Sequence, residues 1–278
     1  MAIAHRTFSP RLLEARDPDV MQGLSDPLIV HVAAPEAFAA AHLPGAICMP
    51  PAALVSGAPP APGVLPEPAE LAARLAAIGY RPERDILIYD DEGGGWAGRF
   101  AWTLDVIGHE RWWVLDGGLH AWANAGRELV GGGAAPEPAA PVELRYDERL
   151  RISGDELLSR HAALCVWDAR SYAEHIGERS GSARAGRIPG SHHCDWLELM
   201  DRERDLRLRE DLPALLAERG IDPSQTVIVH CQTHHRSGLA YLVGRLLDYP
   251  DVRAYDGSWA DWGNRQDTPI DTGRIESP

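Results

Sequence analysis

The feature that most constrains this chain is an internal repeat. Each half contains an apolar segment, a polar loop, a helix-like apolar period and then an Asp-Gly step beside tryptophan. The two steps, Asp116-Gly117 and Asp256-Gly257, are 140 residues apart, whereas Gly79 and Gly220, which precede the apolar segments, are 141 apart. Because self-similarity at a fixed period indicates repeated structural units, we predict two copies of one fold. The first copy has one extra residue in its loop.

The order of elements within each copy predicts an α/β fold. Segments 86–88 and 227–229 are apolar without alternation, which is typical of strands buried on both faces of a parallel sheet. Helical periods occupy residues 68–79 and 211–220 before these strands, and residues 239–246 after the second one. Strands that alternate with helices predict two mostly parallel sheets, each flanked by helices.

Composition places the domain boundary. The 278 residues suffice for two domains. Residues 131–141 are Gly-Gly-Gly-Ala-Ala-Pro-Glu-Pro-Ala-Ala-Pro, which cannot pack a core and indicates a linker. We therefore predict a first domain at 1–130, a linker at 131–144 and a second domain at 145–278. Another Pro-rich stretch, 57–68, is interpreted as a surface loop of the first half.

Charge limits the partners of the chain. It has 27 basic and 41 acidic residues and a formal net charge of −14, which argues against nucleic acid or an anionic membrane as a partner. Every basic residue is arginine, so a lysine Schiff base or lysine general base is excluded. An anion must be held by arginine, histidine or main-chain N–H groups.

The cellular compartment is inferred from cysteines and apolar runs. The four cysteines are far apart and form no disulfide framework, which fits a reducing cytoplasm. The first twenty residues lack the apolar core of a signal peptide. No apolar run approaches the roughly 18 residues of a membrane span, so we expect no membrane partner.

One cysteine lies in a reactive context. Cys231 follows strand 227–230 directly, and the polar loop Gln232–Arg236 leads from it into a helix. The carboxyl end of a parallel strand is where open α/β sheets bind ligands. The free N–H groups and positive dipole of a helix start favour an anion there, which lowers the pKa of a thiol. We therefore predict that Cys231 is a nucleophile.

The other cysteines lack this context, and no metal site is expected. Cys165 lies in an apolar strand and is predicted to be a core residue, and neither Cys48 nor Cys194 precedes a comparable loop. Histidines at 192–193 and 234–235 do not have the paired spacing of a structural zinc site. We expect neither a metal nor another cofactor.

Several motifs together give the chain a family resemblance. It resembles the tandem-domain members of the rhodanese (sulfurtransferase) family. The motifs that carry this resemblance are Phe-Ala-Ala-Ala-His-Leu-Pro-Gly-Ala at 38–46, Trp-Asp-Ala-Arg at 167–170, Cys-Gln-Thr-His-His-Arg-Ser at 231–237 and Ala-Tyr-Asp-Gly-Ser-Trp at 254–259. The cysteine loop is similar to that of bacterial thiosulfate:cyanide sulfurtransferases.

This resemblance implies an activity and a set of site residues. Cys231 would take the outer sulfur of thiosulfate as a persulfide and pass it to cyanide, a thiol or a protein acceptor. The substrate-binding residues would be Gln232, Thr233, His234, His235 and Arg236, of which the last three would attract the thiosulfate anion. The supporting residues would be Ser237, Asp168 and Arg170, and for the last two we favour a structural ion pair.

The first half has no thiol at the corresponding position. Asp90 occupies it when the alignment is taken from the upstream glycines, and Asp91 occupies it when the Asp-Gly steps are used. We therefore expect the first domain to be catalytically inactive and to cover the active-site mouth of the second. Asp90 and Asp91 are interpreted as solvated loop residues.

Three other functions stay open. One is a 3-mercaptopyruvate sulfurtransferase. Another is a cysteine-dependent phosphatase or arsenate reductase, because His230-Cys231 and Arg236-Ser237 resemble the tyrosine phosphatase signature. That signature has five residues between Cys and Arg, whereas this loop has four. The last is a non-enzymatic persulfide carrier.

Overall fold

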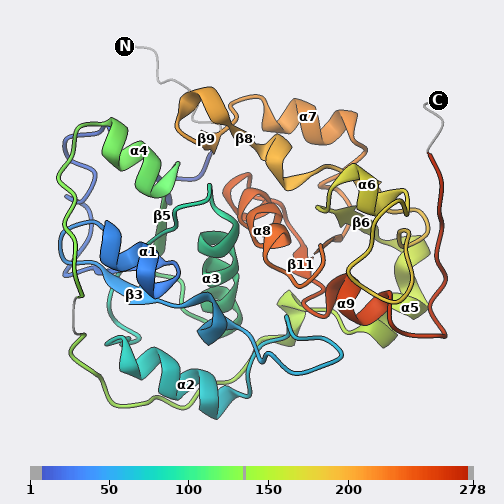
Figure 1. Ribbon diagram of the computed structural model, residues 1–278, viewed down its shortest axis with the longest axis horizontal. Helices are drawn as coiled ribbons and strands as arrows, with labels where there is room; N and C mark the ends of the chain where they lie inside the picture. Colours follow the sequence, from blue (N-terminus) through green and yellow to red (C-terminus); the bar gives the residue numbers. More distant parts are fainter. Residues whose placement is uncertain (1–7, 134–135, 275–278) are drawn as a thin grey trace.

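The computed structural model describes residues 8–133 and 136–274. Residues 1–7, 134–135 and 275–278 lie outside the described part, so the predicted linker and the outer domain ends are seen only in part. Figure 1 shows two α/β units side by side, one from each half of the chain. No helix of the described ranges is long and apolar enough to cross a membrane.

The first unit is built on a five-stranded sheet of order β1-β5-β4-β2-β3, in which all neighbours are parallel. Its strands are β1 (Leu12–Leu13), β2 (Leu28–Val32), β3 (Ile47–Met49), β4 (Ile86–Tyr89) and β5 (Trp112–Leu115). Its helices are α1 (Pro35–Ala40), η1 (Pro51–Leu54), α2 (Pro68–Ala77), α3 (Gly95–Val106) and α4 (Gly118–Asn124). Every residue of β4 is buried, as the unbroken apolar run predicts.

The second unit repeats this plan with a parallel sheet of order β11-β10-β6-β7 and a separate antiparallel pair, β8-β9. Its strands are β6 (Cys165–Asp168), β7 (His192–His193), β8 (Met200–Asp201), β9 (Arg207–Leu208), β10 (Val227–His230) and β11 (Val252–Ala254). Its helices are η2 (Glu148–Leu150), α5 (Gly154–Arg160), η3 (His161–Ala163), α6 (Tyr172–His175), η4 (Trp196–Leu199), η5 (Arg202–Arg204), α7 (Leu212–Glu218), α8 (Arg236–Leu246) and α9 (Ser258–Trp262).

The two sheets have corresponding strand orders. Strands β5-β4-β2-β3 of the first unit match β11-β10-β6-β7 of the second. A parallel bridge between Arg151 and Ala254 stands where β1 pairs with β5 in the first unit. The predicted α/β fold with two tandem, mostly parallel sheets is therefore confirmed.

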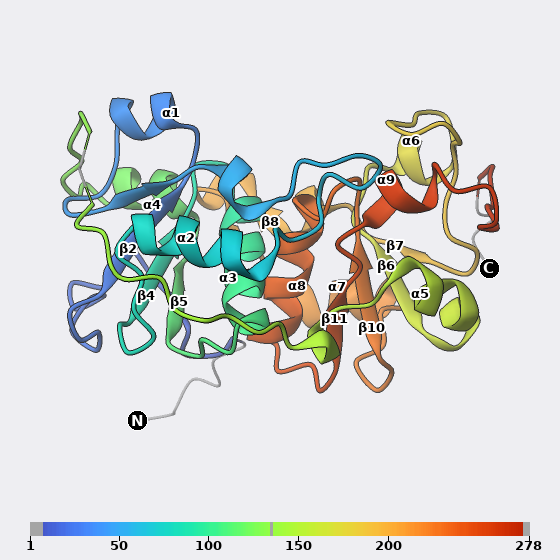
Figure 2. The same ribbon diagram turned by 90° about the horizontal axis from the view of Figure 1, so that it is seen from below.

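Helices α3 and α8 pack against each other between the two sheets, as Figure 2 shows. They approach most closely at Gly98 and Gly238. A Cβ atom on Gly238 would lie 2.5 Å from the main-chain nitrogen of Arg99, so this crossing requires glycine. Buried residues of both units form one continuous hydrophobic core across this contact. The units are thus joined by a packed interface.

A segment of each unit also forms a hydrogen bond with the other unit. The N–H of Leu65 in the first unit donates to Asp256 of the second at 3.2 Å, and the N–H of Leu208 in the second unit donates to Asp116 of the first at 2.8 Å. Stretch 57–68, interpreted above as a surface loop of the first half, therefore packs across the interface, where Gly63 meets the main chain of Thr233. That contact joins residues far apart in sequence, which local composition does not reveal.

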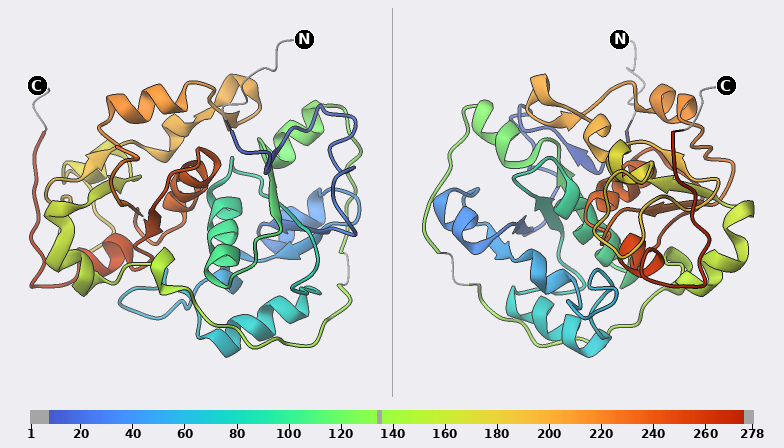
Figure 3. Two further views of the ribbon diagram at one scale, coloured as in Figure 1. Left: turned by 180° about the vertical axis from the view of Figure 1, so that it is seen from behind. Right: turned by 45° about the vertical axis from the view of Figure 1, so that its right-hand side comes forward.

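The chain passes from the first unit to the second along α2, as Figure 3 shows. In this connection the N–H of Ala139 donates to the carbonyl of Ala76 at 2.9 Å, and the hydroxyl of Tyr146 donates to the carbonyl of Pro66 at 2.6 Å. The Pro-rich segment after residue 136 is thus fixed to the first unit by hydrogen bonds.

Candidate active site

Cys231 lies at the corner between β10 and the loop that leads into α8. The residue is 1% exposed. Its N–H donates to the hydroxyl of Ser258 at 3.3 Å, and its carbonyl accepts a hydrogen bond from the N–H of Trp259 at 3.0 Å. The start of α9 therefore fixes the main chain on both sides of the thiol.

The surroundings of Cys231 favour its thiolate. Burial by itself raises the pKa of this thiol, but the charge of Arg236, two hydrogen bonds from Ser237 and the charge of His235 outweigh that effect, so the net pKa is lowered. Burial dominates at the other cysteines and raises the pKa of Cys48 and Cys165, and raises that of Cys194 to about 12. Only one of the four thiols is therefore activated.

Arg236 is held by a carboxylate. Its guanidinium binds Glu174 of α6 with two hydrogen bonds of 2.6 and 2.8 Å. Glu174 also closes a capping box with Ser171 at the start of α6. Burial raises the pKa of Glu174, but the hydrogen bonds from Arg236 and Ser171 outweigh it and lower the pKa to about 2. The ion pair keeps the guanidinium in a fixed position beside Cys231.

His234 is not the cation that the sequence analysis expects. Burial and then the charges of Arg99 and Arg151 lower its pKa well below the usual value, so it is neutral at pH 7. The ring packs edge-on against Trp102 of α3, and Nδ1 lies 2.8 Å from the hydroxyl of Ser237. The tautomer with a proton on Nδ1 would donate to that hydroxyl, leaving its O–H free to donate to Cys231.

His235 lies between the two units. Its ring stacks on Trp96 of α3, with centroids 4.3 Å apart, and lies at a tilt to Trp196 of η4 at 5.5 Å. Its Nε2 forms an ion pair with Glu92, from the loop between β4 and α3. The first unit therefore contributes side chains beside the cysteine loop.

The two residues after the cysteine are fixed by neighbouring segments. The side-chain amide of Gln232 donates to the hydroxyl of Ser182 at 3.1 Å, and the main-chain carbonyl of Gln232 accepts from the N–H of Ala260 at 2.9 Å. Thr233 lies against Gly63 of the first unit. The loop is thus held from both sides.

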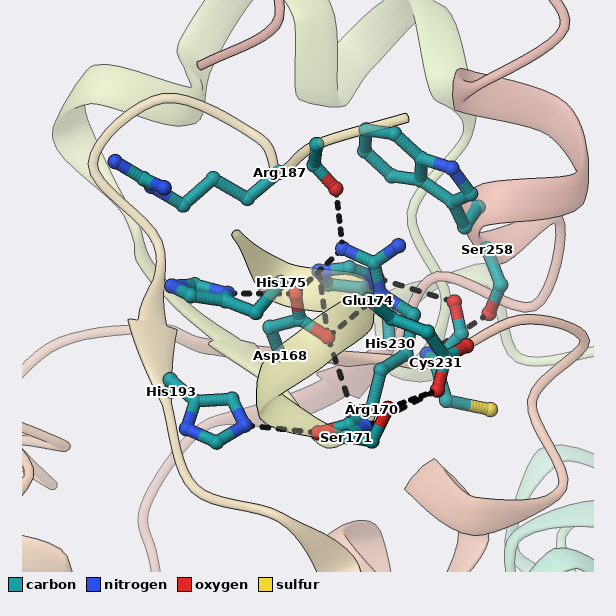
Figure 4. A network of polar contacts seen from close by, with 12 residues as sticks. Asp168, Arg170, Ser171, Glu174, His175, Arg187, His193, His230, Cys231 and Ser258 are labelled. Atoms are coloured by element: carbon teal, nitrogen blue, oxygen red, sulfur yellow. Dashed lines mark hydrogen bonds and ion pairs between the residues drawn. The ribbon is translucent and has the colours of Figure 1, made fainter. Parts of the chain in front are cut away.

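Asp168 and Arg170 form a fully buried ion pair behind the loop, as Figure 4 shows. Asp168 also binds Nδ1 of His175 at 2.8 Å and lies 3.9 Å from Nε2 of His230. Burial raises the pKa of Asp168, but Arg170 and the two histidines outweigh it and hold the pKa well below the usual range. Since Arg170 also lies over the ring of Trp259, the network braces the strand end that carries Cys231.

The first unit places a carboxylate where the second places the thiol. Asp90 follows β4 directly, as Cys231 follows β10, which selects the upstream alignment of the two halves. The carboxylate accepts hydrogen bonds of 2.9 to 3.2 Å from the N–H groups of Glu92, Gly93, Gly94 and Ala97.

The interpretation of Asp90 as a solvated loop residue is therefore wrong. Its exposed fraction is 1%, because the strand-to-helix corner turns its N–H groups inward onto the side chain. Burial and the neighbouring Glu92 raise the pKa of Asp90 to about 6, although the main-chain N–H groups oppose this rise. Asp91 is half-buried.

The histidines outside the loop have structural contacts. His192 and His193 form β7, and the ring of His193 lies 4.8 Å from that of His175. Within residues 8–133 and 136–274, no group of three or more His, Cys, Asp or Glu side chains is arranged to hold a metal ion.

Several residues of the site were not predicted from the sequence. Glu174 carries a local signal, since Ser171 and Glu174 have the spacing of a capping box. Glu92, Trp96, Trp196 and Ser258 carry no such signal. Each reaches the loop from a distant part of the chain, so only the assembled fold brings them to it.

Comparisons with known proteins agree with this geometry. The family model for the rhodanese-like domain matches residues 16–125 and 153–265. The chain is 43% identical over 265 residues to a thiosulfate sulfurtransferase of Azotobacter vinelandii, covering 94% of this chain and 97% of that protein. It is 30% identical over 234 residues to a 3-mercaptopyruvate sulfurtransferase of Escherichia coli, covering 83% of each.

A solved structure supports the fold. The anaerobic ergothioneine biosynthesis enzyme from Chlorobium limicola superposes with a TM-score of 0.84 at 24% identity, over 95% of this chain and 71% of that one. At this identity the similarity concerns the arrangement of elements alone.

Proposed function

The chain belongs to the rhodanese-like family, and on that premise we propose that it is a thiosulfate sulfurtransferase that works through a persulfide on Cys231. The thiolate attacks the outer sulfur of thiosulfate. The S–S bond of thiosulfate breaks, its electron pair leaves with sulfite, and a cysteine persulfide remains. Cyanide or a thiol then attacks the outer persulfur and restores the thiolate.

The observation that carries this proposal is the position of Cys231 at a strand-to-helix corner, between the end of β10 and the start of α8. The lowered pKa of its thiol fits this position, because it increases the fraction of thiolate and stabilises the charge of the terminal persulfur. Arg236 makes the largest contribution to the lowering of this pKa, and it would draw the anionic donor.

The remaining loop residues support this chemistry in different ways. We assign Gln232, Thr233 and His235 to the binding of the donor. Neutral His234 orients the hydroxyl of Ser237, which donates to the sulfur. Asp168 and Arg170 keep the strand end rigid, so that the thiol does not turn away from the loop.

The first domain, 1–130, is proposed to be inactive and to cover the mouth of the second domain, 145–278, with residues 131–144 as the linker. Asp90 fills the first domain's own anion position, which leaves that loop without a nucleophile. The contacts of Gly63 with Thr233 and of Glu92 with His235 support the covering role.

We also propose a cellular compartment for the protein and an acceptor for the sulfur. The four cysteines are unpaired thiols, which suits the reducing cytoplasm. The acceptor is proposed to be cyanide, a small thiol or a thiol on a protein.

A second candidate is transfer from 3-mercaptopyruvate, which the 30% identical relative favours. The loop favours thiosulfate, because it carries His235 and Arg236, which suit a small oxyanion. A phosphatase is disfavoured because four residues between Cys231 and Arg236 leave a smaller ring of N–H donors than a phosphoryl group needs.

Turnover with defined substrates tests the proposal. The protein is incubated with thiosulfate and then cyanide, and thiocyanate is measured. After incubation with thiosulfate alone, the intact mass should increase by one sulfur atom. Peptide mass spectrometry should locate this atom on the peptide that contains Cys231. Absence of both products, with turnover of 3-mercaptopyruvate or a phosphate ester instead, would refute the thiosulfate activity. Persulfide formation without thiocyanate would indicate a carrier.

A further inference from the structure

A carboxylate of the first domain is fixed in place before it meets the cysteine loop. Glu92 lies two residues after Asp90, and its Oε1 accepts the N–H of Trp96 at 3.2 Å in the first turn of α3. The same oxygen pairs with Nε2 of His235. Because its own helix already holds the carboxylate, Glu92 can set the position of the histidine ring.

The ring of His235 is enclosed by groups from both domains. Trp96 lies nearly parallel to one face, with an interplanar angle of 19°, and Trp196 packs at a tilt of 57°. Nε2 is committed to Glu92. Among the described residues, Nδ1 has no hydrogen-bond partner, so it is the one ring nitrogen left for a ligand.

This ring is electrostatically coupled to the reacting sulfur. His235 is the residue before α8, four positions after Cys231, and its charge is one of those that favour the thiolate. Arg236, the other loop cation with this effect, has two of its guanidinium nitrogens occupied by Glu174. When the ring of His235 carries both protons, Nε2–H donates to Glu92, and Nδ1–H is a donor that the loop can still offer to an incoming anion.

We propose that Glu92 is a positioning residue for the binding of an oxyanion sulfur donor. Glu92 holds the imidazolium form of His235 so that Nδ1–H donates to the sulfonate oxygens of thiosulfate. The same N–H then donates to the oxygens of the departing sulfite, which takes the electron pair of the broken S–S bond. The proposal rests on the sulfurtransferase function above. It assigns to the inactive domain a defined part in substrate binding, beyond covering the mouth.

The alternative is that Glu92 merely joins the domains. In that case its loss would lower stability or kcat for every substrate alike. A positioning role acts through one histidine and on one substrate, so it predicts a change in the KM for thiosulfate that depends on His235.

Steady-state kinetics of Glu92→Gln, His235→Gln and the double variant distinguish the positioning role from the purely structural role. Asp91→Asn is the matched control, because it removes the adjacent carboxylate, which has no side-chain hydrogen bond in the described structure. We expect Glu92→Gln to raise the KM for thiosulfate about tenfold, equivalent to about 1.4 kcal/mol, with a much smaller change in kcat and in the KM for cyanide. The double variant should resemble His235→Gln, and Asp91→Asn should resemble wild type.

An unchanged KM for thiosulfate in Glu92→Gln would overturn the proposal. A KM in the double variant that rises by the product of the two single-variant factors would also overturn it. Thiosulfate binding by Cys231→Ala, followed by tryptophan fluorescence beside Trp96 and Trp196, provides a measurement without turnover. Adding Glu92→Gln to that variant should weaken binding by the same factor. If the wild-type protein binds thiosulfate in this way but forms neither persulfide nor thiocyanate, the proposed function fails while the positioning role stands.

Discussion

The carboxylate of Asp90 and the thiol of Cys231 occupy the same position in two copies of one loop. Each directly follows an inner strand of its sheet, β4 or β10, and precedes the helix that packs at the domain interface. In the first copy the carboxylate binds the N–H group of Ala97, and in the second copy Ser237 binds the sulfur. One corner of the fold thus holds a carboxylate in one domain and a thiol in the other.

Removal of the Asp90 carboxylate should destabilise the first domain. In Asp90→Ala the buried N–H groups of Gly93, Gly94 and Ala97 lose their acceptor, which costs about 1–3 kcal/mol for an unsatisfied buried group. Urea unfolding measures the change in the free energy of unfolding. Asp91→Ala serves as the control and should unfold close to wild type. Equal unfolding midpoints for the two variants would contradict the assignment.

Loss of the nucleophile should be selective among the four cysteines. Cys231→Ala should abolish thiocyanate formation, because the other thiols are not activated. Cys48→Ala, Cys165→Ala and Cys194→Ala should keep it, since burial raises the pKa of each of these thiols. Activity with thiosulfate and cyanide is measured for all four, with circular dichroism to verify folding. Substantial activity in Cys231→Ala would rule out the persulfide route.

Arg236→Ala should raise the pKa of the Cys231 thiol, since the charge of this guanidinium makes the largest contribution to lowering it. Because the thiolate is the form that reacts, the pH at which the alkylation rate of Cys231 increases should be higher in this variant. The kcat/KM for thiosulfate at pH 7 should fall about tenfold or more, which corresponds to about 1.4 kcal/mol. Thiolate absorbance against pH reports the shift directly. Arg253→Ala, which removes an arginine paired with Asp251, should leave the titration as it is.

Acid should remove the stabilising contribution of Glu174. Its pKa is about 2 in the folded protein, below the ordinary value of 4.5, so the contribution is complete above pH 4.5 and is lost as pH falls toward 2. At about 1.4 kcal/mol per pKa unit, it is on the order of 3 kcal/mol. The difference in unfolding free energy between wild type and Glu174→Gln should therefore shrink across this range. A constant difference would argue against the pair, and exposed Glu178→Gln gives the baseline.

The helix crossing should not accept a side chain. A Cβ atom at Gly238 would lie 2.5 Å from the nitrogen of Arg99 and 2.6 Å from the carbonyl of Gly95. Gly238→Ala should therefore force α3 and α8 apart at a cost of about 1–3 kcal/mol, with a lower Tm. Gly23→Ala, where nothing lies within 4 Å of the added atom, is the control. A Tm for Gly238→Ala equal to that of this control would contradict the close packing.

The α/β repeat could be predicted from the sequence alone, and so could the position of Cys231 at the end of a strand. Buried parallel strands are apolar along their whole length, and helix periods are local, so both are visible in β4, β10 and α8 without any tertiary information. The corner that activates Cys231 is also local, because the thiol, the loop and the helix start are consecutive residues.

The tertiary structure decided what surrounds that corner. Glu92 meets His235 across 143 positions of the chain, and Leu65 meets Asp256 across 191. Such contacts depend on how α3 packs against α8, and no local pattern encodes that packing. Burial depends on the assembled fold in the same way. Asp90 is polar and lies in a glycine-rich loop, yet the folded corner encloses it, because its carboxylate accepts the N–H groups of Gly93, Gly94 and Ala97.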